Sequence, residues 1–330
     1  MFRSIVLRCK LRKLSIIVTI VFAYIALSYV HGQANARTNE SSTIIAVGDW
    51  GCTPKTLIVS DLIRNKNPDL VLGLGDYVLE KNSSADCFFN MIHSFQDKMK
   101  IAIGPHDIAP ELFDQYVEQF NLTRQYYSFN HKNIHFVTIS TEIPFKKYTP
   151  QYEFVTNDLE NATKNTLINW IVVFFHKPAY TSSAIGGKIA ESIRDTYHPL
   201  FDKYGVDLVL QAHNHYYERT FPIMYNELNS TNPIVTDHNM TKYDSIKGPI
   251  FITSGTGGGD LHAYKGEREY TANYYEGQGF VEIKINKIDT MLNETFHSMD
   301  GMSYDEFNIV KSKSCTNNDV IANRDQSVNC

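Results

Sequence analysis

The stretch Leu210-Gln-Ala-His-Asn-His-Tyr-Tyr-Glu-Arg219 places two histidines, His213 and His215, directly after the apolar run Val206–Leu210. A short apolar run of this kind predicts a buried strand, and residues two apart on an extended chain project to the same side. Both imidazoles can therefore point into one cavity and bind metal ions there. A His-x-His pair alone is a weak signal, because two surface or core histidines produce it about as often.

Four other apolar runs end at a side chain of the kind that binds metal or transfers protons. They are Ile44-Ile-Ala-Val-Gly-Asp49, Leu70-Val-Leu-Gly-Leu-Gly-Asp76, Ile101-Ala-Ile-Gly-Pro-His106-Asp107 and Ile171-Val-Val-Phe-Phe-His176. Open α/β sheets collect their ligands at the carboxyl ends of strands, so these ends together predict one site with more than one metal ion. Taken singly, Asp49 or Asp76 is better explained as a turn residue, and His176 equally well as a hydrogen-bonded core histidine.

The order of these blocks resembles the calcineurin-like metallophosphoesterases and, within them, the purple acid phosphatase branch. The blocks of that branch are G-D-x-G, G-D-x-x-Y, G-N-H-[DE], V-x-x-H and G-H-x-H. They read here Gly48-Asp-Trp-Gly51, Gly75-Asp-Tyr-Val-Leu79, Gly104-Pro-His-Asp107, Val173-Phe-Phe-His176 and Ala212-His-Asn-His215. The run Thr253-Ser-Gly-Thr-Gly-Gly-Gly259 also looks like this branch. It lacks the Lys-Ser/Thr of a P-loop and is interpreted as a tight loop beside the site.

The resemblance implies that Asp49, Asp76 and His215 hold one metal ion. Asp76, His176 and His213 would hold the other, with Asp76 bridging the two. Such a pair of cations ionises a bridging water and neutralises the oxygens of an in-line displacement at phosphorus. Carboxylate and imidazole ligands suit two divalent transition metal ions, Fe, Mn or Zn, rather than Mg or Ca alone.

His106 would then be the catalytic residue that is not a ligand, donating to the phosphoryl oxygens or to the leaving group. Three positions depart from the family pattern. Leu79 replaces the expected tyrosine, and Tyr77 is a poor substitute because adjacent strand residues face opposite ways. Pro105 replaces the asparagine that in the family completes the shell of the metal held by Asp76, His176 and His213, which leaves water or the neighbouring Asp107 to complete it. Lys177–Gly186 lacks the histidines that follow V-x-x-H, so a substrate preference is not transferred.

Composition favours a secreted globular enzyme. The chain has 330 residues, of which 43% are hydrophobic and 12% aromatic, so it can bury one large core. A net charge of -5 and a pI near 6.2 give no electrostatic basis for binding nucleic acid. The expected partner is a phosphorylated small molecule or a phosphoprotein as substrate, and a membrane only through an N-terminal anchor.

Residues 1–36 are predicted to be a signal peptide or a signal anchor. Basic residues between Arg3 and Lys13 precede the apolar stretch Leu14–Val30, and Ala34-Asn-Ala36 is a small-x-small cleavage pattern. The apolar stretch is long for a signal peptide and short for a membrane span, so cleavage and anchoring by residues 14–30 both stay open. Either way, the catalytic part is expected outside the cytoplasm.

Export agrees with the sequons and the cysteines. Asn-x-Ser/Thr sequons predict a glycoprotein, unless they stay unmodified, and begin at Asn39, Asn82, Asn121, Asn161, Asn229, Asn239 and Asn293. An oxidising compartment predicts disulfides. We favour Cys52–Cys87, because each cysteine follows an aspartate-bearing strand end, together with Cys315–Cys330.

Residues 42–302 are the predicted metallophosphoesterase domain, in which apolar strands alternate with helices. Expected strands are Thr43–Val47, Asp69–Leu74, Met99–Ile103, Ile134–Ile139, Leu167–Phe175, Val206–Leu210, Pro249–Thr253, Gly279–Ile285 and Met291–Phe296. Expected helices are Thr53–Lys66, Phe88–Lys98, Ala109–Phe120, Thr149–Thr163 and Ile189–Tyr204. This α/β (α+β) pattern fits a four-layer α/β/β/α sandwich of two packed mixed sheets, the calcineurin-like phosphoesterase fold that the resemblance implies. Asn226–Lys247 is interpreted as a surface insertion, and residues 303–330 as a polar C-terminal tail.

The function that follows is a secreted metal-dependent phosphoesterase, a hydrolase acting as a phosphomonoesterase in the manner of acid phosphatases. Two alternatives stay open. A phosphodiesterase of the same fold is disfavoured by Gly51, where such enzymes usually carry histidine. A metal-poor, non-catalytic surface binding protein is suggested by Pro105, which removes a metal ligand.

Overall fold

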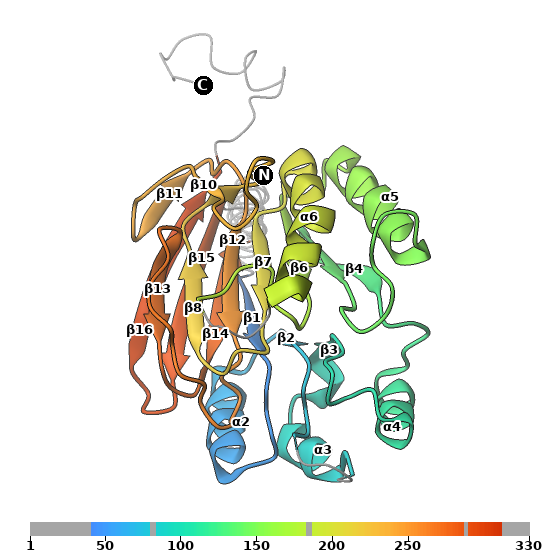
Figure 1. Ribbon diagram of the computed structural model, residues 1–330. Coiled ribbons are helices and arrows are strands. Elements are labelled where there is room, and N and C mark those ends of the chain that lie inside the picture. The colour runs from blue at the N-terminus through green and yellow to red at the C-terminus, as the bar shows by residue number, and fades with distance from the viewer. Residues whose placement is uncertain (1–40, 80–83, 183–186, 287–289, 312–330) are drawn as a thin grey trace, which may run out of the picture. The chain divides into compact units, whose positions relative to one another are not determined.

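The computed structural model describes residues 41–79, 84–182, 187–286 and 290–311 (Figure 1). The chain divides into two compact units, and the larger one, Ser42–Ile285 with Asp289–Cys330, carries the fold described below. The signal or anchor segment, the first two sequons and the cysteines Cys315 and Cys330 lie outside the described residues. Among the described helices, none is both long and apolar enough to span a bilayer.

The first sheet has seven strands in the order β11-β16-β15-β14-β1-β2-β3. Their bounds are β1 Ser41–Val47, β2 Leu70–Gly73, β3 Met99–Ile101, β11 Lys242–Asp244, β14 Gly279–Asn286, β15 Met291–Ser298 and β16 Ser303–Val310. The strands β1, β2 and β3 are parallel, whereas β14, β15 and β16 form antiparallel pairs. The sheet is therefore mixed, as predicted.

The second sheet also has seven strands, in the order β13-β8-β12-β7-β6-β5-β4. Their bounds are β4 Tyr127–His131, β5 Ile134–Thr138, β6 Trp170–Phe174, β7 Leu208–Gln211, β8 Tyr217–Thr220, β12 Ile250–Ser254 and β13 Thr271–Tyr275. Its central strands β5, β6, β7 and β12 run parallel, β4 and β8 pair antiparallel with β5 and β12, and β13 pairs antiparallel with β8 at the edge. A separate short pair consists of β9 Ile223–Met224 and β10 Ile234–Val235.

Alternate residues of each strand enter different layers. In β1, Ile44 and Ala46 belong to the core between the two sheets, which strands of both sheets fill. Ile45 and Val47 belong instead to a cluster with residues of α2 (Pro54–Lys66), α3 (Asp86–Ile92) and α4 (Pro110–Phe120). The second sheet packs in the same way against α5 (Pro150–Lys164) and α6 (Gly187–Tyr204). The layers are helix, sheet, sheet and helix, so the predicted sandwich is confirmed.

Local signals explain where the helices begin and end. Thr53 caps α2 by accepting from the backbone N–H groups of Lys55 and Thr56, and Thr149 caps α5 in the same way. Asn67, in the left-handed conformation, ends α2. The helix expected at Phe88–Lys98 is interrupted: α3 ends at Ile92 and a 3-10 turn follows at Gln96–Lys98.

The predicted start of the polar tail is wrong, because β16 occupies Ser303–Val310. Asp305 is buried within this strand, and its carboxylate forms a bidentate pair with the buried guanidinium of Arg219. It also accepts from the Tyr217 hydroxyl at 2.6 Å. The alternating pattern of this strand is not recognisable in the sequence because the charged Asp305 faces inward. Burial of Asp305 is possible because Arg219, more than eighty residues earlier, pairs with it.

The predicted disulfide between Cys52 and Cys87 is confirmed, with the two Cα atoms 6.0 Å apart. It ties the turn after β1 to the start of α3. The two cysteines are 35 residues apart, and loop closure of that length stabilises a fold by about 3–4 kcal/mol.

Candidate metal centre

Three of the predicted ligands sit on turns with an unusual backbone. Asp49, Asp76 and His213 each follow a strand end and adopt positive φ angles of 56°, 57° and 73°. Such a conformation costs a residue with a side chain on the order of 1–2 kcal/mol, and it clusters at functional sites. Three potential ligands therefore lie on strained turns at the carboxyl ends of their strands.

Asp76, His176 and His213 form a group whose ligand atoms all lie within 4.8 Å of one another. His176 Nε2 lies 3.2 Å from Asp76 Oδ2 and 3.2 Å from His213 Nδ1. His176 Nδ1 donates to the Leu74 carbonyl at 2.8 Å, which fixes the ring so that Nε2 faces the group. This is the geometry of three convergent ligands with an outer hydrogen bond orienting one of them.

Asp49 and His215 form a second pair beside this group. Asp49 Oδ1 lies 3.3 Å from His215 Nε2, and Asp49 Oδ2 accepts from the His213 N–H at 2.8 Å. His215 Nδ1 donates to the carbonyl of Asp260, which again leaves Nε2 facing inward. Apart from this contact with His215, Asp49 Oδ1 is buried and makes no hydrogen bond with any described residue. A buried carboxylate oxygen that lacks a hydrogen-bond donor fits a bound cation.

Burial and mutual charge shift the pKa values of all three residues in this group. Burial opposes charge on Asp76, but the charge and hydrogen bond of His176 outweigh it and lower the Asp76 pKa to about 2. Burial lowers the pKa of His176, but the charge of Asp76 and its hydrogen bond to the ring outweigh burial and raise that pKa to about 10. Burial and the nearby His176 charge lower the pKa of His213 to about 4, so its lone pair is available near neutral pH. A cation must therefore displace a proton from His176, and acid opposes binding.

Glycines allow the loops to approach these side chains closely. A Cβ atom at Gly75 would lie 2.7 Å from His176 Nδ1, and one at Gly255 would lie 2.6 Å from Asp49 Oδ2. The N–H groups of Gly257 and Gly259 donate to the carbonyls of Gly48 and Asp49. The glycine run is thus the tight loop predicted, and at least these two amides already have partners.

His106 lies next to the group, with its backbone N–H donating to Asp76 Oδ1 at 2.9 Å and its side chain exposed. Asp107 does not take the place of the missing asparagine. Its fully buried carboxylate accepts from the backbone N–H groups of Asp76, Tyr77 and Gly104 at 2.7, 3.0 and 2.8 Å. It holds two loops together, so its hydrogen bonds contradict the expectation that Asp107 completes the shell of a metal ion.

Hydrocarbon occupies the position where the family pattern has a tyrosine. Leu79 Cδ1 would lie 2.8 Å from a Cβ on Gly259 and 3.0 Å from one on Gly51, so it packs over both glycines. Tyr77 is buried on the helical side, where its hydroxyl donates to the Ala102 carbonyl at 2.7 Å. Its orientation agrees with the prediction that it is not a ligand.

Two residues beside the group were not predicted from the sequence. The ring of His262 stacks on His215, with centroids 3.9 Å apart and planes at 10°. Lys177 Nζ pairs with Glu142 Oε2 at 2.7 Å, and its charge helps lower the pKa of His213. His262 stands three residues after the glycine run, a position that gives little signal on its own.

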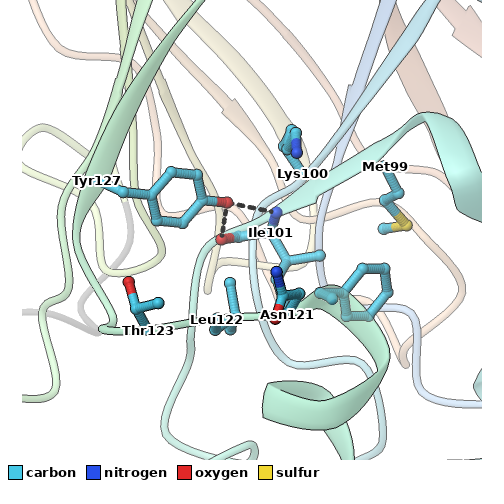
Figure 2. Close-up of a pocket in the computed structure, with 8 residues that line it drawn as sticks. Met99, Lys100, Ile101, Asn121, Leu122, Thr123 and Tyr127 are labelled. Atoms are coloured by element: carbon cyan, nitrogen blue, oxygen red, sulfur yellow. Dashed lines mark hydrogen bonds between the residues drawn. The ribbon is translucent and has the colours of Figure 1, made fainter.

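A pocket elsewhere on the molecule carries no comparable chemistry. It has a volume of about 180 Å³ and lies between β3, the end of α4 and the start of β4 (Figure 2). The Tyr127 hydroxyl accepts from the Ile101 N–H and donates to the Ile101 carbonyl, both at 2.9 Å, and so covers the edge of β3. None of the predicted ligands lines this pocket.

Comparison with known proteins agrees with this geometry. The family model of the calcineurin-like phosphoesterases matches residues 42–217, a range that contains every predicted ligand and His106. Purple acid phosphatase 15 of Arabidopsis thaliana is 28% identical over 253 residues, which are 63% of this chain and 47% of that protein. Phosphoenolpyruvate phosphatase of Allium cepa is 32% identical over 257 residues, which are 70% and 51% of the two chains. The chain thus spans about half the length of these relatives.

Solved structures show the same fold. Purple acid phosphatase PPD1 from yellow lupin seeds superposes with a TM-score of 0.68 at 20% identity, covering 84% of this chain and 56% of that one. GAP50, described as the anchor in the inner membrane complex of Plasmodium, superposes with a TM-score of 0.61 at 14% identity. That match covers 86% of this chain and 93% of the other.

Proposed function

Because the chain belongs to the calcineurin-like phosphoesterase family, we propose that it is a secreted, metal-dependent phosphomonoesterase similar to the acid phosphatases among its relatives. The observation that carries this proposal is the convergence of Asp76, His176 and His213, with the buried pair of Asp49 and His215 beside them. Side chains from the ends of separate strands meet there although nothing in a purely structural core requires it.

Asp76, His176 and His213 would hold one divalent transition metal ion, and Asp49, Asp76 and His215 would hold the other. The mixture of carboxylate and imidazole donors fits Fe, Mn or Zn. When bound, the ions supply the positive charge that lowers the pKa of a water nucleophile and neutralises the phosphoryl oxygens.

The remaining residues position the substrate. His106 has an exposed side chain beside Asp76, where it can donate a hydrogen bond to a phosphoryl oxygen or a proton to the departing alkoxide. Its backbone N–H donates to Asp76 Oδ1, so the position of the His106 loop is fixed relative to the Asp76 carboxylate. Asp107 reinforces that relation through its bonds to the backbone of both loops.

Export is supported by the disulfide between Cys52 and Cys87, because disulfides persist in oxidising compartments. We propose a phosphorylated small molecule or a phosphoprotein as the substrate. Cleavage of the N-terminal segment and anchoring by it both remain compatible with this location.

A metal-poor binding protein is the second candidate, and one observation favours it. Pro105 offers no side-chain ligand, and both oxygens of Asp107 accept from backbone amides. The ion between His176 and His213 therefore has only three protein ligands. Three ligands with open positions are nevertheless enough for a catalytic site of the zinc type.

Metal analysis of the purified protein, paired with two chromogenic substrates, tests the proposal. We expect close to two equivalents of transition metal and hydrolysis of p-nitrophenyl phosphate faster than of its bis ester. Asp76→Asn and His213→Ala should abolish turnover, whereas His238→Ala, on the exposed surface, should not. Near-zero metal without rescue by Mn, Fe or Zn would support the binding protein, and faster cleavage of the bis ester would support a phosphodiesterase.

A further inference from the structure

The segment Asp260–His262 contacts the predicted ligand His215 through hydrogen bonds and ring stacking. Asp260 accepts a hydrogen bond from His215 Nδ1 through its carbonyl. The His262 N–H donates to the His215 carbonyl at 3.2 Å, and the His215 N–H donates to His262 Nδ1 at 3.3 Å. The two imidazole rings are stacked almost parallel. Both the backbone and the ring of His215 are therefore fixed by residues that lie 45 to 47 positions further along the chain.

The predicted ligands differ in what holds them. His176 is fully buried, and its neighbours enclose it on every side. His215 keeps 11% of its side chain exposed and is covered on one face by the half-buried ring of His262. Removing that ring would open a space beside His215 into which its imidazole could rotate. His176 has no such room on any side, whereas His215 would gain it on the face that His262 covers.

We propose that His262 is a positioning residue that holds His215 in its ligating orientation. It acts on the ion shared by Asp49 and His215 rather than on the ion between His176 and His213. This inference rests on the proposed function. Loss of a residue that orients a ligand typically weakens metal affinity about 10–100-fold, so the effect of removing His262 should fall in that range.

Three substitutions separate the contributions of the ring. His262→Ala removes both the stacking and the Nδ1 acceptor. His262→Phe keeps the stacked ring but cannot accept from the His215 N–H. His262→Asn places an oxygen acceptor near the Nδ1 position without the ring. His238→Ala is the matched control, because His238 is exposed and packs on Phe221 rather than on a predicted ligand.

The measurement is metal content by elemental analysis after equilibration with a graded chelator, without substrate. We expect one of the two equivalents of metal in His262→Ala to be lost at a chelator strength about 10–100-fold lower than in the wild type, whereas the other is lost at the wild-type strength. His262→Phe and His262→Asn should each recover part of the difference, and His238→Ala should match the wild type. With excess metal, the kcat of His262→Ala should return and its KM for p-nitrophenyl phosphate should be unchanged.

Equal retention of both ions by the wild type and His262→Ala would overturn the inference while leaving the proposed function intact. A raised KM at saturating metal would also overturn it, because His262 would then contact substrate. A wild type that holds no ion would overturn the inference and the proposed function together. Far-ultraviolet circular dichroism of each variant verifies the fold, and the conservative His262→Phe keeps the inference testable if His262→Ala unfolds.

Discussion

Substituting Asp107 tests whether this carboxylate is a structural residue rather than a metal ligand. It is fully buried and accepts three backbone hydrogen bonds, from Asp76, Tyr77 and Gly104. Burial and the neighbouring Asp76 charge raise the pKa of Asp107 to about 8, so its bonds are not counted as bonds to a charged group. Each buried donor left without a partner nevertheless costs about 1–3 kcal/mol. We therefore expect Asp107→Ala to lower the free energy of unfolding by about 5 kcal/mol, a loss that few single substitutions reach.

Urea unfolding followed by tryptophan fluorescence measures this effect, because both tryptophans, Trp50 and Trp170, are fully buried. A chelator must be present throughout, so that loss of a stabilising metal does not add to the difference. Asp107→Asn should recover at most about half of the loss, because the amide oxygen still accepts while its NH₂ group faces an N–H donor. Asp97→Ala, on the exposed surface, should stay within about 0.5 kcal/mol of the wild type.

Asp107→Ala with unaltered stability but one metal ion fewer would refute this reasoning. Asp107 would then be the missing ligand of the ion between His176 and His213.

Three further predictions concern other positions. The hydrogen bond from His297 and the neighbouring lysines outweigh burial and hold the pKa of Glu282 at about 2, below its ordinary 4.5. Its contribution to stability is therefore present above pH 4.5 and lost as the pH falls toward 2, and Glu282→Gln should remove that dependence in acid unfolding curves. Because Leu79 supplies no phenolate, the purified active enzyme should lack the intense visible band of a tyrosinate–iron(III) complex, and an absorption spectrum with that band would contradict the site. Pro105→Asn should slow the loss of the ion between His176 and His213 during dialysis against a chelator, without reducing turnover. Unchanged retention would show that another group completes the shell of that ion.

The sequence could predict the site where its signals are local. Asp49, Asp76 and His176 each end an apolar run, so the position of the strand end and the identity of the ligand type are read from adjacent residues. Asp49 and Asp76 share the carboxyl edge of the first sheet because β1 and β2 are parallel neighbours. His176 follows β6 of the second sheet, so the packing of the two sheets brings it beside them. Their role as ligands stays a prediction.

The parts that could not be predicted depend on contacts between distant segments. The strand β16 contains an inward-facing Asp305 that is acceptable only beside Arg219. His262 belongs to no recognisable motif, and its importance follows only from its contact with the ring of His215, 47 residues earlier in the chain. Asp107 looks like a spare ligand in the sequence, and only its three backbone partners reveal its structural role.

Anomalous diffraction from crystals grown with Mn or Zn would show whether the strand ends bind two metal ions. We expect two peaks, one among Asp76, His176 and His213 and one beside Asp49 and His215. Soaking with a mild chelator should reduce one peak before the other. An absence of both peaks, or peaks only at surface carboxylates, would contradict the claim that these strand ends form a dinuclear metal centre.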